Sequence, residues 1–233
     1  MNPLDSNIIH FLNQFSRQSS FWDNLIYTVS NETITGPLVT SIFWWLWFRN
    51  DERTQERRQI ILSGFFLCTL SIFLARALAI VLPFRERPMR NPAFVLPYGA
   101  DAKTLLRWSS FPSDHAVFCF ALATIIFLLS RRLGIVSFLY TLVLICLPRI
   151  YLGYHYPTDI LMGALIGIGI ASLSAIESVR TFLSSGPIRL LERSRSAFYS
   201  SFYLVTFLFG TMFDPLTSIA RFAISASRQI LHR

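Results

Sequence analysis

The stretch IILSGFFLCTLSIFLARALAIVL, residues Ile60 to Leu82, decides the fold of this protein. As an α-helix, these 23 residues rise roughly 34 Å, enough to cross a hydrocarbon core ~30 Å thick. Other apolar runs flank it along the chain: Thr35–Phe48, which is short and rich in Trp, Ala116–Ser130, Leu133–Leu152, Asp159–Ile176 and the weaker Tyr199–Phe213. The pattern predicts an all-α, integral-membrane helical bundle with five to six transmembrane helices.

The composition agrees with a membrane protein. Apolar residues make up 53% of the 233 residues and charged residues 15%, well below the roughly 25% of soluble domains. The formal net charge is nevertheless +8, and 20 of the 21 cations are Arg, with Lys103 the exception. A nucleic-acid partner is disfavoured, because the Arg residues lie at the ends of apolar runs and no basic groove module is present.

The two ends of the chain differ from the apolar runs. Near the N-terminus, apolar residues recur at helical spacing among polar ones: Leu4, Ile8, Phe11 and Phe15. This predicts an amphipathic helix over residues 4–28 that lies on the membrane. We expect residues 1–196 to form the membrane core, and residues 197–233 to form a weak span or a second amphipathic helix.

The loops carry a topology signal. Three Arg-rich segments alternate consistently and are expected in the cytoplasm by the positive-inside rule: Arg49–Arg58, Ser130–Leu133 and Arg180–Arg195. The loop over residues 84–112 then faces the opposite side, although it contains five cations. Either the topology is inverted, or this loop keeps its cations to bind a ligand.

A first polar cluster, Arg85-Glu86-Arg87-Pro88, follows the span that ends at Leu82. A guanidinium group presents a planar fork of donors that matches the oxygens of phosphate. Taken alone, the cluster is more typical of charged residues solvated at the edge of a membrane.

A second cluster, Pro112-Ser113-Asp114-His115, comes directly before an apolar run. Ser113 or Asp114 would cap a helix there, and free backbone N–H groups at such a start attract anions. His115 would lie in the first turn, where it can donate a proton. The alternative is an ordinary helix cap beside an interfacial histidine.

A third cluster joins two spans. Arg149 ends one, Gly153 permits a tight turn, and Pro157 can open the next helix. Asp159 follows His155 by four residues, so its carboxylate can bond one ring nitrogen and leave the other free as a nucleophile. The alternative is an Asp that satisfies the helix start beside an unrelated His.

Together, the three clusters resemble the signature motifs of the type-2 phosphatidic-acid phosphatase superfamily, K-x6-R-P, P-S-G-H and S-R-x5-H-x3-D. The matching residues lie between 87 and 159, in order and at span boundaries: Arg87, Pro88, Pro112, Ser113, His115, Arg149, His155 and Asp159. The resemblance is greatest to a bacterial branch similar to undecaprenyl-diphosphate phosphatases.

Three positions depart from these motifs. Ile80 stands where the first motif has Lys, Asp114 replaces the Gly of the second, and Pro148 replaces the Ser of the third. Since Ile80 cannot bind phosphate, we expect Arg85 to supply the missing cation, with Arg76 as the second candidate.

The resemblance implies roles for individual residues. His155 attacks the terminal phosphorus and forms a phosphohistidine, and Asp159 orients it. His115 protonates the leaving oxygen and then activates water. The phosphate-binding residues would be Arg85, Arg87, Arg149, Ser113 and Asp114. No metal or other cofactor is implied, because the arginines supply the positive charge.

The resemblance further implies a multi-pass phosphatase of the inner (plasma) membrane, with its site on the extracytoplasmic side. The leading substrate is a polyisoprenyl diphosphate, namely undecaprenyl diphosphate; the alternatives are phosphatidylglycerophosphate, phosphatidate or lipid A phosphates. A non-catalytic membrane transporter or lipid-binding protein remains a further alternative. The sequence does not determine the oligomeric state.

Overall fold

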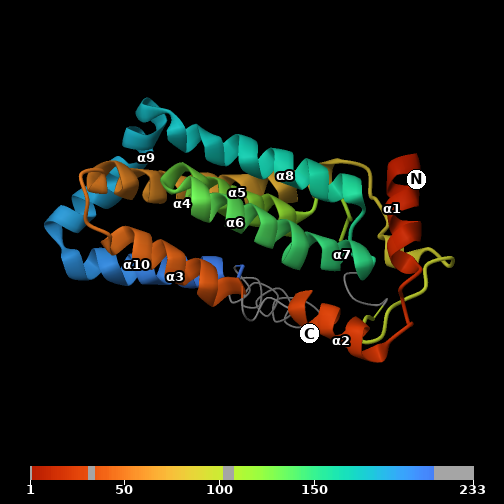
Figure 1. The fold of residues 1–233 in the computed structure, drawn as a ribbon. Helices are drawn as coiled ribbons and strands as arrows, with labels where there is room; N and C mark the ends of the chain where they lie inside the picture. The colour runs from red at the N-terminus through yellow and green to blue at the C-terminus, as the bar shows by residue number, and fades with distance from the viewer. Residues whose placement is uncertain (1, 31–34, 102–107, 213–233) are drawn as a thin grey trace, which may run out of the picture. The chain divides into compact units, whose positions relative to one another are not determined.

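The computed structural model describes residues 2–30, 35–101 and 108–212, and within these ranges it contains helices and no strand (Figure 1). The all-α prediction is confirmed. Contacts divide the chain into two compact units. The first joins Met1–Asn31 with Gln55–Ser185, and the second joins Glu32–Thr54 with Gly186–Arg233.

The first unit holds the polar clusters. Its elements are α1 (Pro3–Asn13), α2 (Ser20–Ser30), α4 (Thr54–Val81), η1 (Pro88–Arg90), α5 (Asp114–Leu129), α6 (Arg131–Tyr140), η2 (Thr141–Cys146), α7 (Leu147–Tyr151), α8 (Pro157–Ser172) and η3 (Leu173–Ala175). Among the described residues, three helical stretches are long and apolar enough to cross a membrane: Thr54–Val81, Arg131–Tyr151 and Pro157–Ala175. They match three of the spans expected from the sequence. Two shorter apolar helices, Leu38–Phe48 and Asp114–Leu129, fall below that length, so the count of five to six stays a prediction.

The long helix from α6 to α7 changes its winding midway. Thr141–Cys146 forms a π-helical turn just before Pro148, which has no backbone N–H to continue the regular ladder. The side chain of Arg149 donates from Nη1 to the carbonyl of Ile145, 3.1 Å away. The irregular turn therefore holds Arg149 at the end of the span.

Helices α5 and α8 pack together closely because α8 carries glycine on the contacting face. A Cβ added at Gly167 would lie 2.2 Å from the carbonyl oxygen of Val117, and one at Gly163 would lie 2.7 Å from that of Ser113. Small residues allow such an approach of two helix backbones. The same pairs show that the two helices run in parallel, so their N-terminal ends lie together.

The N-terminal prediction of one amphipathic helix over residues 4–28 is wrong in its extent. The chain forms α1 and α2 with a turn between them, in which Arg17 adopts a φ of 61°. The predicted apolar stripe is also divided. Ile8 packs beside the buried Ile9 against the core, whereas Leu4 and Phe11 are exposed.

The second unit contains an aromatic interface between α3 (Thr35–Phe48) and α10 (Arg195–Gly210). The ring centroids of Trp47 and Phe198 are 5.1 Å apart, and those of Trp44 and Phe202 are 4.9 Å apart. The helix α9 (Glu177–Arg193) precedes α10. A weak span or amphipathic helix is expected over residues 197–233. The part of this segment beyond residue 212 lies outside the described residues.

Candidate active site

Backbone hydrogen bonds join the first and third polar clusters. The N–H of Met89 donates to the carbonyl of Gly153 at 3.0 Å. Gly153 has a φ of +73°, and a Cβ there would lie 2.8 Å from the ring of Phe94 and 2.9 Å from Cβ of Met89. A left-handed turn with so little room requires glycine. This turn brings the end of α7 back beside the loop that carries Arg87.

The second cluster is tied to the third by the same means. The N–H of Ser113 donates to the carbonyl of Asp159 at 3.2 Å, and the Ser113 hydroxyl accepts from the N–H of Ala116 as the cap of α5. Both groups of Ser113 thus hold the start of α5 in place. This arrangement makes its first role structural, although the sequence suggested a phosphate contact.

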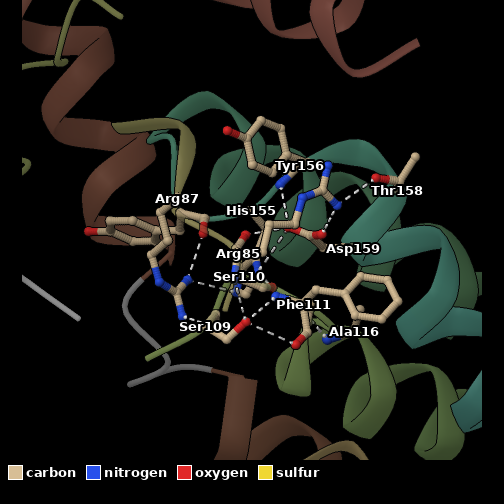
Figure 2. Close-up of polar contacts among 12 residues, drawn as sticks. Arg85, Arg87, Ser109, Ser110, Phe111, Ala116, His155, Tyr156, Thr158 and Asp159 are labelled. Atoms are coloured by element: carbon tan, nitrogen blue, oxygen red, sulfur yellow. Dashed lines mark hydrogen bonds and ion pairs between the residues drawn. The ribbon is translucent and has the colours of Figure 1, made fainter. Parts of the chain in front are cut away.

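His155 lies at the centre of the site and is 3% exposed (Figure 2). Its Nδ1 is 2.8 Å from the carbonyl oxygen of Ser110, so Nδ1 carries the proton. Nε2 is then unprotonated, and its lone pair accepts a hydrogen bond from Nη1 of Arg87 at 3.3 Å. Burial, reinforced by the charge of Arg87, holds the pKa of His155 well below its usual value. The imidazole is neutral, as a nucleophile must be.

Asp159 does not bond His155 directly, contrary to the arrangement expected from their spacing. Its Oδ2 is 3.9 Å from Nδ1 of His155, beyond hydrogen-bond length. Oδ2 instead accepts from the Ser110 hydroxyl and from the N–H of Tyr156, the latter at 2.8 Å. The carbonyl of Ser110 accepts the hydrogen bond from Nδ1 of His155. Asp159 therefore acts on the imidazole through Ser110.

Two of the predicted phosphate-binding arginines are buried, and Arg87 contacts the imidazole, whereas the Arg149 side chain donates to the carbonyl of Ile145. Arg87 is 6% exposed and Arg149 4% exposed. Arg87 donates to the carbonyls of Tyr154 and Ser109, at 2.6 and 3.2 Å. Its Nε is buried, and no group among the described residues accepts from it. A buried donor of this kind is normally satisfied, so Nε of Arg87 is available to donate to a bound ligand.

The substituted position of the second motif contacts its histidine. An Asp114 oxygen is 2.9 Å from Nδ1 of His115, which leaves Nε2 of His115 for other contacts. Asp114 also interacts electrostatically with His155 and with Arg76 of α4. The acid therefore faces both histidines, where it orients His115.

Arg85 is bound to protein carboxylates rather than left open for phosphate. Its guanidinium pairs with Asp5 at 2.6 Å and with Asp159, and it lies 4.2 Å from the centre of the Tyr156 ring. Arg76 is the half-buried cation on the Asp114 side, whereas Ile80 is 78% exposed. Two further cations of this loop, Lys103 and Arg107, lie outside the described residues.

Two residues of this arrangement, Ser110 and Asp5, are not predicted by the three motifs. Ser110 is distant in sequence from the histidine that it contacts and has no motif of its own. The sequence does contain a pattern that could have indicated Asp5, because this residue shares a helix face with the apolar Ile9 and Leu12. A single carboxylate on an apolar face needs a buried counter-charge.

Comparison with known proteins extends the match beyond the motifs. A family model described as the PAP2 superfamily matches residues 84–182. The chain is 30% identical over 179 residues to the protein named "Putative undecaprenyl-diphosphatase YbjG" from Escherichia coli (strain K12), covering 75% of this chain and 82% of that protein.

Two Bacillus proteins are also similar. One, named undecaprenyl-diphosphatase BcrC, from Bacillus subtilis (strain 168), is 25% identical over 73% of this chain and 82% of its own length. The other, from Bacillus licheniformis, is named bacitracin transport permease protein BcrC and is 23% identical over 72% and 77%. No solved structure matches the chain. With its three motifs at one end of a helical bundle and these relatives over most of its length, the chain is a membrane protein that belongs to the PAP2 superfamily.

Proposed function

We propose that this protein is a membrane phosphatase that removes the terminal phosphate of a polyisoprenyl diphosphate through a phosphohistidine at His155. The observation that carries the proposal is the state of that imidazole. Nδ1 donates to the Ser110 carbonyl, and the unprotonated Nε2 faces the buried guanidinium of Arg87. A nucleophile with a cation beside it suits attack on an anionic phosphoryl group.

In the first step, the Nε2 lone pair of His155 forms a bond to the terminal phosphorus. The bond from that phosphorus to the bridging oxygen breaks, and the electron pair leaves with the lipid phosphate. His115 gives its proton to the departing oxygen. In the second step His115 takes a proton from water, the oxygen of that water attacks phosphorus, and the N–P bond breaks to release inorganic phosphate.

Positive charge stabilises the transferred group in both steps. Arg87 offers its Nε, and Arg149 adds a buried guanidinium at the end of α7. In place of Arg85, whose guanidinium pairs with two carboxylates, Arg76 is the candidate for the cation that Ile80 does not supply. The mechanism needs no metal, so turnover is expected to continue in excess chelator.

The substrate class is inferred from the relatives. Two of the similar proteins carry the name undecaprenyl-diphosphatase, so undecaprenyl diphosphate is the leading substrate. Phosphatidylglycerophosphate, phosphatidate and lipid A phosphates remain alternatives for the same chemistry. We place the protein in the inner (plasma) membrane with the site facing outward, since the Arg-rich loops on the other side favour the cytoplasm.

A substrate panel tests the proposal. The purified full chain in detergent would be given each of these four lipids, and the release of inorganic phosphate measured. Undecaprenyl diphosphate is expected to be hydrolysed fastest, and His155→Gln to release none. Faster release from one of the other three lipids would move the substrate assignment, and release that His155→Gln does not diminish would refute the mechanism.

A transport function is the second candidate, because one relative is named a transport permease. The two functions are separable by the same variant. A transporter does not need a nucleophile, so cells that express His155→Gln would keep any protection from bacitracin that the unaltered chain gives. Loss of that protection together with phosphate release would favour the phosphatase.

A further inference from the structure

Helix α1 buries a carboxylate on a face that is otherwise apolar. Asp5 is 0% exposed and lies one turn before Ile9, which packs in the core with residues of α5, α7 and α8. A buried carboxylate loses its hydration, and an ion pair rarely stabilises a fold more than apolar side chains of similar volume. The position of Asp5 therefore indicates a use beyond packing.

Asp5 caps the first turn of α8 from outside that helix. Its Oδ1 accepts from the backbone N–H of Thr158 at 3.0 Å, and its Oδ2 accepts from the Thr158 hydroxyl at 2.8 Å. Thr158 is the second residue of α8, where the N–H has no acceptor within the helix. Since Asp159 is the next residue, Asp5 fixes the turn that carries Asp159.

The same carboxylate holds Arg85. Oδ2 of Asp5 is 2.6 Å from Nη2 of Arg85, while Nη1 of that guanidinium contacts Oδ1 of Asp159. Asp159, like Asp5, is 0% exposed. Arg85 therefore bridges two buried carboxylates, and its planar fork sets the distance between them.

The second oxygen of Asp159 extends this chain of hydrogen bonds towards the imidazole. Figure 2 shows the chain from Arg85 onward. The Ser110 hydroxyl donates to it, and the Ser110 carbonyl accepts the Nδ1 proton of His155. We infer that Asp5 is a positioning residue for the nucleophile. By holding Arg85 and the start of α8, it keeps Asp159 and Ser110 where they select the tautomer and direction of the imidazole. The inference rests on the proposed function of His155.

The test is Asp5→Asn in the full chain, a change that removes the charge and keeps the shape. Misplacement of a reacting group costs up to about 100-fold in rate, so kcat for undecaprenyl diphosphate is expected to fall by about 10- to 100-fold. KM is expected to stay the same, because Asp5 does not touch the substrate. An unchanged kcat in folded protein would overturn the inference.

A double-variant comparison separates positioning from general damage. If Asp5 acts mainly through Arg85, the Asp5→Asn change lowers kcat much less in an Arg85→Gln background than in the unaltered chain. Equal fold losses in both backgrounds would overturn the part of the inference that runs through Arg85, and would assign the whole effect to the start of α8. Should Asp5→Asn not fold, Arg85→Lys carries the same expectation with Asp5 intact, because an ammonium group cannot bridge both carboxylates.

Asp23 on α2 supplies a matched control. It is also 0% exposed, and its bonds go to the Tyr151 hydroxyl and to the N–H groups of Arg17 and Tyr98. Asp23→Asn removes a buried charge of the same kind and is expected to lower the thermal midpoint while kcat is retained. A loss of kcat equal to that of Asp5→Asn would show that any buried carboxylate suffices, against the inference.

A spectroscopic readout keeps this test separate from the proposed function. In histidine labelled with ¹⁵N, the ring shifts of His155, assigned by their absence in His155→Gln, report which nitrogen carries the proton. The Nδ1–H tautomer is expected in the unaltered chain and a mixture of tautomers in Asp5→Asn. An unaltered tautomer in the variant would refute the positioning role even if the chain hydrolyses lipid. Failure to hydrolyse any of the lipids would refute the function alone.

Discussion

At the scale of single residues, the proposed mechanism gives the two histidines separable tasks. The leaving group of a diphosphate is itself a phosphate, which departs with less help from an acid than an alkoxide does. His115→Ala is therefore expected to form the phosphohistidine from undecaprenyl diphosphate but to release phosphate about 10²–10⁴-fold more slowly, since water lacks its base.

Rapid quenching with labelled substrate would measure this covalent intermediate. Its accumulation in His115→Ala and its absence in His155→Gln is the expected pair of results. A His115→Ala protein that neither turns over nor accumulates the intermediate would assign His115 to the first step instead.

The lowered pKa of His155 predicts how the protein responds to acid. Its folded pKa lies below the ordinary value of ~6.5, so the unfolded chain takes up the proton first as the pH falls. Conformational stability from this group is therefore complete above pH ~6.5 and declines below it, while the folded imidazole stays neutral. An NMR titration of His155 with a midpoint at or above 6.5 would contradict this.

Single residues also show which contacts of the site can be predicted from the sequence. The spacing of His155 and Asp159 predicted their neighbourhood, because Asp159 lies in the first turn of the helix that begins two residues after His155. It did not predict the Ser110 that stands between them, since that contact depends on how the loop before α5 folds over α8. Likewise, the sequence predicted a phosphate contact for Arg85. Its two carboxylate partners come from separate segments, so no local pattern shows that they pair with it.

At the scale of elements, the contact of α5 with α8 depends on glycine at two positions of α8, Gly163 and Gly167. Gly167→Ala places a Cβ 2.2 Å from the Val117 carbonyl oxygen and must push the helices apart. Overpacking of this kind destabilises by about 1–3 kcal/mol. Because the motifs sit at the ends of these helices, activity is expected to fall too.

Gly169 on the same helix is the matched control, since a Cβ there meets no atom within 4 Å. Gly169→Ala is expected to leave the thermal midpoint equal or slightly raised, because alanine favours the helix over glycine. Scanning calorimetry of both variants measures the difference. Equal midpoints for the two would mean that α5 and α8 adapt to the added methyl group.

Among the elements, the apolar runs predicted the helices of the first unit well. An apolar run of that length in a membrane has few other ways to form the hydrogen bonds of its backbone. The N-terminal segment was harder. Its polar and apolar residues fit a helix on a membrane surface as well as one packed on protein, and periodicity alone does not tell which face meets Ile160 and Phe120.

At the scale of the whole molecule, orientation in the membrane is the open prediction. Helix α4 is long and apolar enough to cross a membrane, so we expect the residues before it and after it to face opposite sides. In a chain with Cys119→Ala, a cysteine at the exposed Ala93 is expected to react with an impermeant maleimide on intact spheroplasts. One at the exposed Glu52 would react only after permeabilisation. The reverse pattern would invert the topology and place the site in the cytoplasm.

The aromatic interface of α3 and α10 has a consequence for spectroscopy. Of the five tryptophans, Trp44, Trp45 and Trp47 belong to the second unit, and two of them pack against rings of α10. Intrinsic fluorescence therefore reports mainly on that unit, while the chemistry resides in the other. Emission can consequently change at one temperature and turnover vanish at another, so an optical melting curve would not by itself give the lifetime of the working enzyme.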